Sequence, residues 1–332
     1  ASDRSNFSAG VTDFRWAMKD VPPLKEESFT STIKNHLSRI QFQLSELRHP
    51  YTPKNILGTW EQACSELLKD ENFGYTLSRD NGWLNDVVDE ASGKAKDNLE
   101  KAKNIYAYMR DNMTCTNYNR THLEKPLKSV LKTRNGSEAE INLLLTAMFL
   151  KAGFRADPVL LSTRSHGYTY SMYPLMDRFN YVISRLELEG QFYYLDASKP
   201  RMGFGKLGTE SYNGHARVIN DIATPVSFIS DSLTEKKITS VFIINDEKGN
   251  LVGNMQKTPG FYESYGLRNR IKEKGREQLF SDMSKGFNAE VEIKKPVIDS
   301  LENYEEPLRL RYEFDIKTGG EDIIYFNPML GE

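Results

Sequence analysis

Few side chains in this sequence of 332 residues could act as nucleophiles or as acid–base groups. It holds two cysteines, Cys64 and Cys115, and five histidines. A cysteine enzyme needs a thiolate beside a histidine that takes and returns the proton, so thiol chemistry would have to use one of these two sulfurs. Two cysteines are too few for a disulfide scaffold or a cysteine-based zinc site, and the histidines form no metal-binding spacing. We therefore expect no metal and no cofactor.

A buried helix is the clearest local element that could position chemical groups. Ser137-Glu138-Ala139-Glu140 has the pattern of a capping box, in which the first and last side chains bond each other's backbone N–H. The run Ile141 to Leu150 is apolar on nearly every side, and Gly153 suits the residue after a helix end. A strand from Asp157 to Ser162 follows directly.

A β-hairpin comes next, with strands Phe179 to Leu188 and Gln191 to Asp196 around the turn Glu189-Gly190. With a two-residue turn, Leu188 pairs with Gln191, and Ile183 pairs with Asp196. Tyr181 then lies on the same face as Asp196, diagonally offset and within reach of a long side chain.

Helix, strand and hairpin in this order resemble the core of papain-like and transglutaminase-like proteins. The stretch 131–162 (LKTRNGSEAEINLLLTAMFLKAGFRADPVLLS) is similar to the Gly-x-Cys, Leu-Leu, Ala-Gly and Pro-Val segment of bacterial transglutaminase-like domains. The stretch 179–200 (FNYVISRLELEGQFYYLDASKP) is similar to their Phe-Asn-His-Val-Ile and Leu-Asp-Ala-Thr segment. More closely, the chain resembles bacterial cell-envelope proteins that carry this core between two β-rich domains.

The resemblance implies a triad, of which two members are replaced here. The family's cysteine lies in the first turn of the buried helix, where this chain has Glu138, and its histidine position holds Tyr181. Only the acid remains, as Asp196. A phenol with a pKa near ~10 is a poor base at neutral pH, and a carboxylate is a weak acyl-transfer nucleophile. We therefore assign no catalytic residue with certainty and interpret the chain as a pseudoenzyme.

Three further residues could contact a ligand at the cleft. Ser137 could replace the nucleophile, although its capping role explains it without catalysis. Arg164 and His166 lie in a loop after the strand that borders the helix, where they could bind a ligand or simply be solvated.

The preferred hypothesis is a non-catalytic binding or scaffold module in the bacterial cell envelope, periplasmic or at the cell surface, with a peptide, glycan or protein partner. The first alternative is an active thiol enzyme (transglutaminase, amidase or protease) that uses Cys115. The second is a purely structural segment of a larger envelope protein.

Charge and hydropathy argue against nucleic acid as a partner and against a membrane-spanning helix. Forty-four Lys and Arg against 46 Asp and Glu give a formal charge of −2, so nothing favours nucleic acid. The longest apolar run, Ile141 to Leu150, is far shorter than the ~20 residues of a membrane-spanning helix.

We expect an α+β fold with three parts. Residues 1–50 form a β-rich segment at the end of a preceding domain, with alternating strands at Phe14 to Met18 and Ile40 to Leu44. Residues 51–225 form the transglutaminase-like domain, which begins with helices. Residues 226–332 form a β-rich, incomplete domain with one helix, from about Tyr262 to Lys285.

Overall fold

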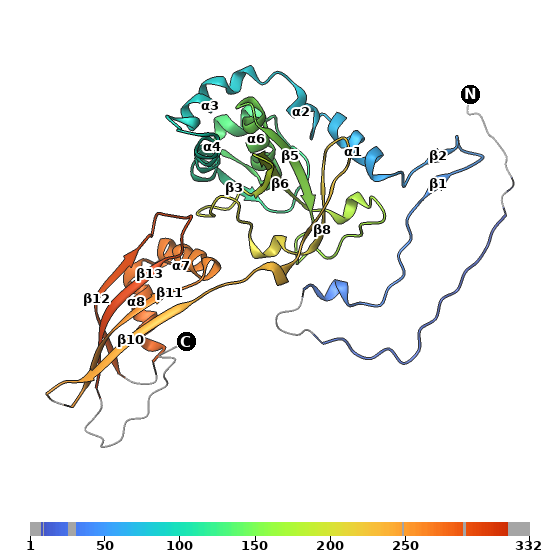
Figure 1. Ribbon diagram of the computed structural model, residues 1–332. Helices are drawn as coiled ribbons and strands as arrows, with labels where there is room; N and C mark the ends of the chain where they lie inside the picture. The colour runs from blue at the N-terminus through green and yellow to red at the C-terminus, as the bar shows by residue number, and fades with distance from the viewer. Residues whose placement is uncertain (1–7, 9, 26–30, 248, 288–289, 318–332) are drawn as a thin grey trace.

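A computed structural model describes the chain except for residues 1–7, 9, 26–30, 248, 288–289 and 318–332 (Figure 1). The described chain combines helices with sheets that are antiparallel except for one short parallel pair, which confirms the α+β prediction. None of the helices among these described residues is long and apolar enough to cross a membrane.

The larger sheet has five antiparallel strands in the order β7-β6-β5-β8-β9. The predicted hairpin is present, and Leu188 pairs with Gln191 as expected. Its last pair is Ser184 with Leu195, so Asp196 follows the second strand directly. The strands are β5 (Arg155–Leu161), β6 (Tyr181–Leu188), β7 (Gln191–Leu195), β8 (Gly214–Val218) and β9 (Pro225–Phe228).

Helix α6 (Glu138–Lys151) is the predicted buried helix and packs against β6 and β5. Every residue from Glu138 to Phe149 is buried, because the sheet covers one side and other helices cover the rest. These helices are α1 (Trp60–Lys69), α2 (Tyr75–Ser78), α3 (Asn85–Ser92), α4 (Asn98–Asn112) and α5 (Leu127–Thr133). Burial of so many apolar side chains, at roughly 25 cal/mol per Å², makes this packing the main stabilising contribution.

A second, four-stranded antiparallel sheet lies apart from the first in Figure 1, with the order β10-β11-β13-β12. The prediction of one helix from about Tyr262 to Lys285 is wrong, because two helices are present. Gly275, with a φ of 86°, separates α7 (Phe261–Lys274) from α8 (Arg276–Lys285), a backbone conformation that glycine adopts readily. The strands are β10 (Ile238–Asn245), β11 (Leu251–Thr258), β12 (Val291–Asp299) and β13 (Arg309–Ile316).

The described residues between 8 and 58, which we call the arm, extend to one side of the larger domain, the one built on the five-stranded sheet (Figure 1). The strands predicted at Phe14 to Met18 and Ile40 to Leu44 are not formed. Alternation alone does not make a strand without a neighbour to bond its backbone. The described arm pairs only β1 (Glu46–Leu47) with β2 (Lys54–Asn55). The domain boundaries at 50 and 225 stay predictions.

Candidate functional site

The carboxylate of Asp196 is the centre of a buried hydrogen-bond network at the first turn of α6. It is fully buried, and its Oδ1 accepts from Asn142 Nδ2 at 2.9 Å. Oδ1 also accepts from the backbone N–H of Ser198 at 3.0 Å and from the Ser198 hydroxyl at 2.6 Å. A buried carboxylate with this many donors is well compensated for the loss of water.

The fourth donor is Tyr181, at the position where the family resemblance implies a histidine. Its hydroxyl donates to Asp196 Oδ2 at 2.7 Å and lies 3.1 Å from the Ser198 hydroxyl. Burial, together with the charge of Asp196, raises the pKa of Tyr181 well above its usual value. Tyr181 therefore holds its proton at any physiological pH and acts as a donor to Asp196.

Glu138, at the position implied for the nucleophile, is also fully buried. Its Oε1 accepts from the backbone N–H of Arg120 at 3.0 Å, and its Oε2 has no hydrogen-bond partner. Burial raises the pKa of this carboxyl from 4.5 to about 8, and the charge of Asp196 adds to the shift. The group is therefore largely protonated at neutral pH.

Glu140, in the same first turn of α6, fixes the same loop. Its Oε1 accepts from the backbone N–H groups of Glu124 and Lys125 at 3.1 and 3.0 Å. Its Oε2 accepts from Ser137 N at 2.9 Å, and the Ser137 hydroxyl accepts from Glu140 N at 3.3 Å, which confirms the predicted capping box. Ser137 is thus occupied as a helix cap, and the two glutamates tie the 119–125 loop to α6.

Cys115 lies closer to these groups than its position in the sequence indicates. It sits on β3 (Thr114–Asn117), which pairs in parallel with β4 (Asn135–Ser137) so that Cys115 is opposite Gly136, two residues before Glu138. Its sulfur donates to the Asn117 carbonyl at 3.3 Å, and burial raises the thiol pKa to about 11. No hydrogen bond joins this sulfur to a histidine in the part of the chain that the structure describes.

Side chains from both domains close over the network. The Tyr118 hydroxyl donates to the Ser198 carbonyl at 3.2 Å, and the Lys199 ammonium lies 4.2 Å from the centre of the Tyr118 ring. Lys199 also pairs with Glu210. The smaller domain docks beside them, where Arg201 donates to Asn269 of α7 at 2.7 Å. A substrate would have to displace these contacts to reach Tyr181.

The two loop residues predicted to border one cleft line two different hollows. His166 lines a small one, of about 300 Å³, together with the 119–124 loop, Phe179 and Asn180. Arg164 lines another, of about 390 Å³, together with Tyr168 and Tyr212. Neither Glu138 nor Tyr181 lines these hollows, because both side chains are fully buried.

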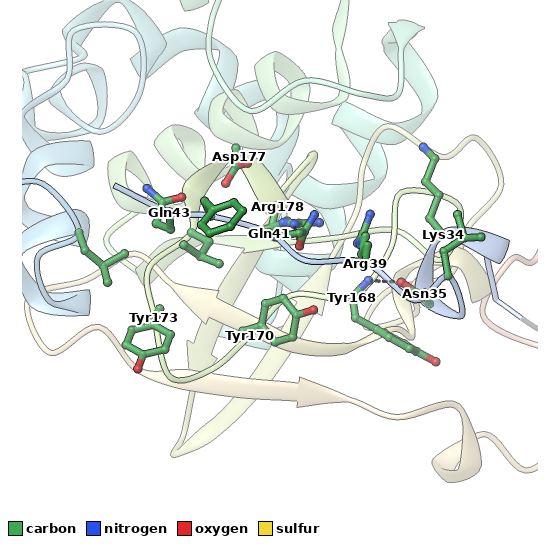
Figure 2. Close-up of a pocket in the computed structure, with 14 residues that line it drawn as sticks. Lys34, Asn35, Arg39, Gln41, Gln43, Tyr168, Tyr170, Tyr173, Asp177 and Arg178 are labelled. Carbon is green, nitrogen blue, oxygen red and sulfur yellow. Dashed lines mark hydrogen bonds between the residues drawn. The ribbon is translucent and has the colours of Figure 1, made fainter. Parts of the chain in front are cut away.

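A larger groove, of about 740 Å³, lies between the arm and the loop before β6 (Figure 2). Tyr168, Tyr170 and Tyr173 follow one another along the loop, and each is about half exposed. The arm forms the opposite wall and contributes Lys34, Asn35, Arg39, Gln41 and Gln43. The arm is anchored where Asn35 Oδ1 accepts from Tyr168 N at 2.9 Å and where Arg178 donates to Gln41. Sequence reasoning missed this groove, although Tyr-x-Tyr-x-x-Tyr in one loop was a visible signal.

The comparisons with known proteins bear on the larger domain. Residues 85–178 match the Transglutaminase-like superfamily. These residues form a transglutaminase-like domain. The match includes α6 and Glu138 but ends before Tyr181 and Asp196, so the assignment of the triad positions to these residues stays a prediction.

Other comparisons add little about function. A crystal structure from Parabacteroides distasonis ATCC 8503, described as a "putative protease", is similar with a TM-score of 0.37 and 10% identity. The similarity covers 78% of this chain and 52% of that one, so this chain spans about half the length of that protein. A search of curated proteins gives no match.

The raised pKa of the Glu138 carboxyl predicts that the stability of the folded protein depends on pH. An acid whose pKa is raised by folding keeps its proton in the folded state but loses it in the unfolded chain, so stability falls as the pH rises from about 4.5 to about 8. With ~1.36 kcal/mol per pKa unit, the full effect on the free energy of unfolding is at most about 5 kcal/mol. Glu138→Gln keeps the acceptor for Arg120 N–H and removes the titration.

We expect Glu138→Gln to be close to the wild type in stability at pH 5 and clearly more stable than it at pH 9, as measured by urea unfolding. Since all other titrating groups are shared, the difference between the two proteins isolates Glu138. An offset between them that is the same at both pH values would show that Glu138 ionises normally.

Proposed function

We propose that this chain is a non-catalytic transglutaminase-like module that binds a partner. The hydrogen bond from Tyr181 to Asp196 is the observation that carries the proposal. In a cysteine enzyme of this architecture, the acid orients an imidazole that exchanges protons with a thiol. A phenol whose pKa is raised by burial cannot perform this exchange at neutral pH.

Glu138 supports the same conclusion from the side of the nucleophile. Its carboxyl is buried, mostly protonated and bonded to Arg120 N–H, so it is neither accessible nor activated. The α6 N-terminus that would stabilise a thiolate instead anchors a loop. The transglutaminase-like architecture thus serves as a rigid support.

The rival proposal is a thiol enzyme that uses Cys115. The position of Cys115 near Glu138 favours the thiol enzyme. However, a thiol pKa of about 11 leaves almost no thiolate at neutral pH. In the described chain, no imidazole forms a hydrogen bond with the sulfur. Both neighbouring acids, Glu138 and Asp196, raise that pKa further.

The tyrosine-lined groove is the binding surface that we propose for the partner. Tyrosine and arginine are the residues that contribute most at interfaces, since they offer a large contact area and a polar tip. Lys34, Arg39 and Arg178 outnumber the single acid in the lining, Asp177. We therefore propose an acidic peptide as the partner and place the module in the bacterial envelope, as the family resemblance implies.

Thiol reactivity tests the choice between module and enzyme. We expect iodoacetamide to modify Cys115 at pH 7.5 at least about tenfold more slowly than a free cysteine, whose pKa is ~8.5. Cys64→Ser removes the only other thiol, and Cys115→Ser serves as the blank. Fast labelling at this pH that Cys115→Ser abolishes would favour the enzyme.

Restoring the triad tests the assignment of its positions. In a background with Cys64→Ser and Cys115→Ser, we expect Glu138→Cys with Tyr181→His to give a thiol pKa below the ~8.5 of free cysteine. Glu138→Cys alone is the control, because it has the helix N-terminus but no imidazole. If the single and double variants titrate alike, Tyr181 is not at the histidine position.

Binding tests the groove. We expect a fluorescent poly-glutamate peptide to bind more tightly than poly-lysine of equal length, with an affinity that falls as salt rises. Tyr170→Ala and Arg178→Ala should each weaken binding about tenfold, which is typical of interface hot spots. Tyr51→Ala, at an exposed tyrosine outside the groove, is the control. Equal binding of both peptides would contradict the acidic partner.

A further inference from the structure

Arg217, on strand β8, is a buried cation to which the described residues supply no carboxylate. It is 5% exposed, and no aspartate or glutamate that the structure describes forms an ion pair with it. Burial raises the pKa of the neighbouring Cys64 thiol to about 11, so this group is neutral at pH 7. Burial and the charge of Arg217 lower the pKa of His215 to about 4, so the imidazole is neutral as well. Buried charges in proteins are normally paired, and Arg217 therefore lacks a counter-ion.

The hydrogen bonds of Arg217 are also incomplete. A guanidinium carries five N–H donors. Here Nη1 donates to the Ala223 carbonyl at 2.7 Å and Nη2 to the Ser171 carbonyl at 3.3 Å, and Nη2 also lies 3.5 Å from His215 Nε2. Nε has no hydrogen-bond partner. The Trp60 ring, whose centre is 4.0 Å from Cζ, holds the guanidinium from one face by a cation–π contact. The group is thus fixed in position while donors remain unused.

Arg217 lines a hollow of about 550 Å³ beside the start of α1, which we call the Arg217 hollow. Leu57 and Tyr173 line both this hollow and the tyrosine-lined groove. Figure 2 shows Tyr173 at the opposite end of the row of tyrosines from Tyr168. The Arg217 hollow therefore continues the groove at its Tyr173 end.

We propose that the Arg217 hollow binds a carboxylate of the acidic peptide that occupies the groove. This inference rests on the proposed function, because the groove has to bring the peptide to the hollow. The carboxylate supplies the counter-ion that the described protein does not provide, and a planar guanidinium is the group that best matches a carboxylate. The C-terminal carboxylate of the peptide and an acidic side chain share this chemistry.

Two glutamates in the lining, Glu46 and Glu61, oppose an incoming carboxylate. Glu46 is already paired with Arg48. Glu61 is exposed, and a hydrogen bond from its own backbone N–H lowers its pKa, with smaller contributions from Thr59 and from the charge of Arg217. Solvent screens the repulsion from an exposed carboxylate such as Glu61. The loss of Glu61 and the loss of Arg217 should therefore change binding in opposite directions.

Binding of the fluorescent poly-glutamate peptide at low salt tests the Arg217 hollow. We expect Arg217→Gln to raise the dissociation constant at least about tenfold, because it removes the counter-ion. We expect Glu61→Gln to lower the dissociation constant about twofold, because it removes a repelling charge at the surface. Arg155→Gln is the matched control, since it removes a positive charge at a side chain that is 83% exposed and lines neither the groove nor the hollow.

Amidation of the peptide C-terminus distinguishes the two sources of the carboxylate. If the terminal carboxylate fills the hollow, amidation should weaken binding to the wild type as much as Arg217→Gln does, and should have no further effect on that variant. If a glutamate side chain fills it, amidation should leave binding unchanged while Arg217→Gln still weakens it.

The variants separate failure of the hollow from failure of the groove. Wild-type affinity in Arg217→Gln, together with weak binding in Tyr170→Ala and Arg178→Ala, would overturn the hollow and leave the groove in place. Absence of peptide binding to the wild type would overturn both. Circular dichroism checks that each variant is folded. If Arg217→Gln is not, the exposed Glu61 decides, and unchanged or weaker binding in Glu61→Gln would overturn the proposal.

Discussion

Burial of the first turn of α6 is the constraint on which the larger domain depends. A helix begins with backbone N–H groups that have no partner within the helix, and here they lie away from water. The Ser137 hydroxyl accepts from the backbone N–H of Glu140, and the Glu140 carboxylate accepts from that of Ser137. One turn further on, the Asn142 side chain donates to Asp196. Each acid also bonds a neighbouring segment, so the cap of one helix fixes a loop and the end of the β6–β7 hairpin.

The same contacts bury the side chains at the positions that we assign to the triad. A catalytic site needs an accessible nucleophile and a base that gains and loses a proton. Here the Tyr181 hydroxyl donates to Asp196, and Glu138 accepts from the backbone N–H of Arg120 in the 119–125 loop. Under the proposed assignment of the triad positions, both replacements turn a reactive position into a structural contact. Oε2 of Glu138 is buried and has no hydrogen-bond partner.

Elements with strong local signals could be predicted from the sequence. The capping box and apolar run predicted α6, and the Glu189-Gly190 turn fixed the register that brings Tyr181 to Asp196. Asn142, a polar residue inside that run, was a signal for a buried partner such as Asp196. The proximity of Cys115 to Glu138 could not be predicted, because it arises from a parallel pairing between distant segments. Strand β12 is hard to recognise in the sequence, because Lys294, Lys295 and Pro296 at its bulge interrupt the alternation that marks a strand.

The ionisation of the Cys115 thiol is the most direct test of a module without thiol chemistry, because the rival thiol enzyme requires a thiolate at neutral pH. It can be followed by the ultraviolet absorbance of the thiolate during a pH titration of the Cys64→Ser protein, where Cys115 is the only sulfhydryl. We expect a thiol pKa of about 11 for a thiol that takes no part in catalysis. A pKa below the ~8.5 of a free cysteine would contradict it.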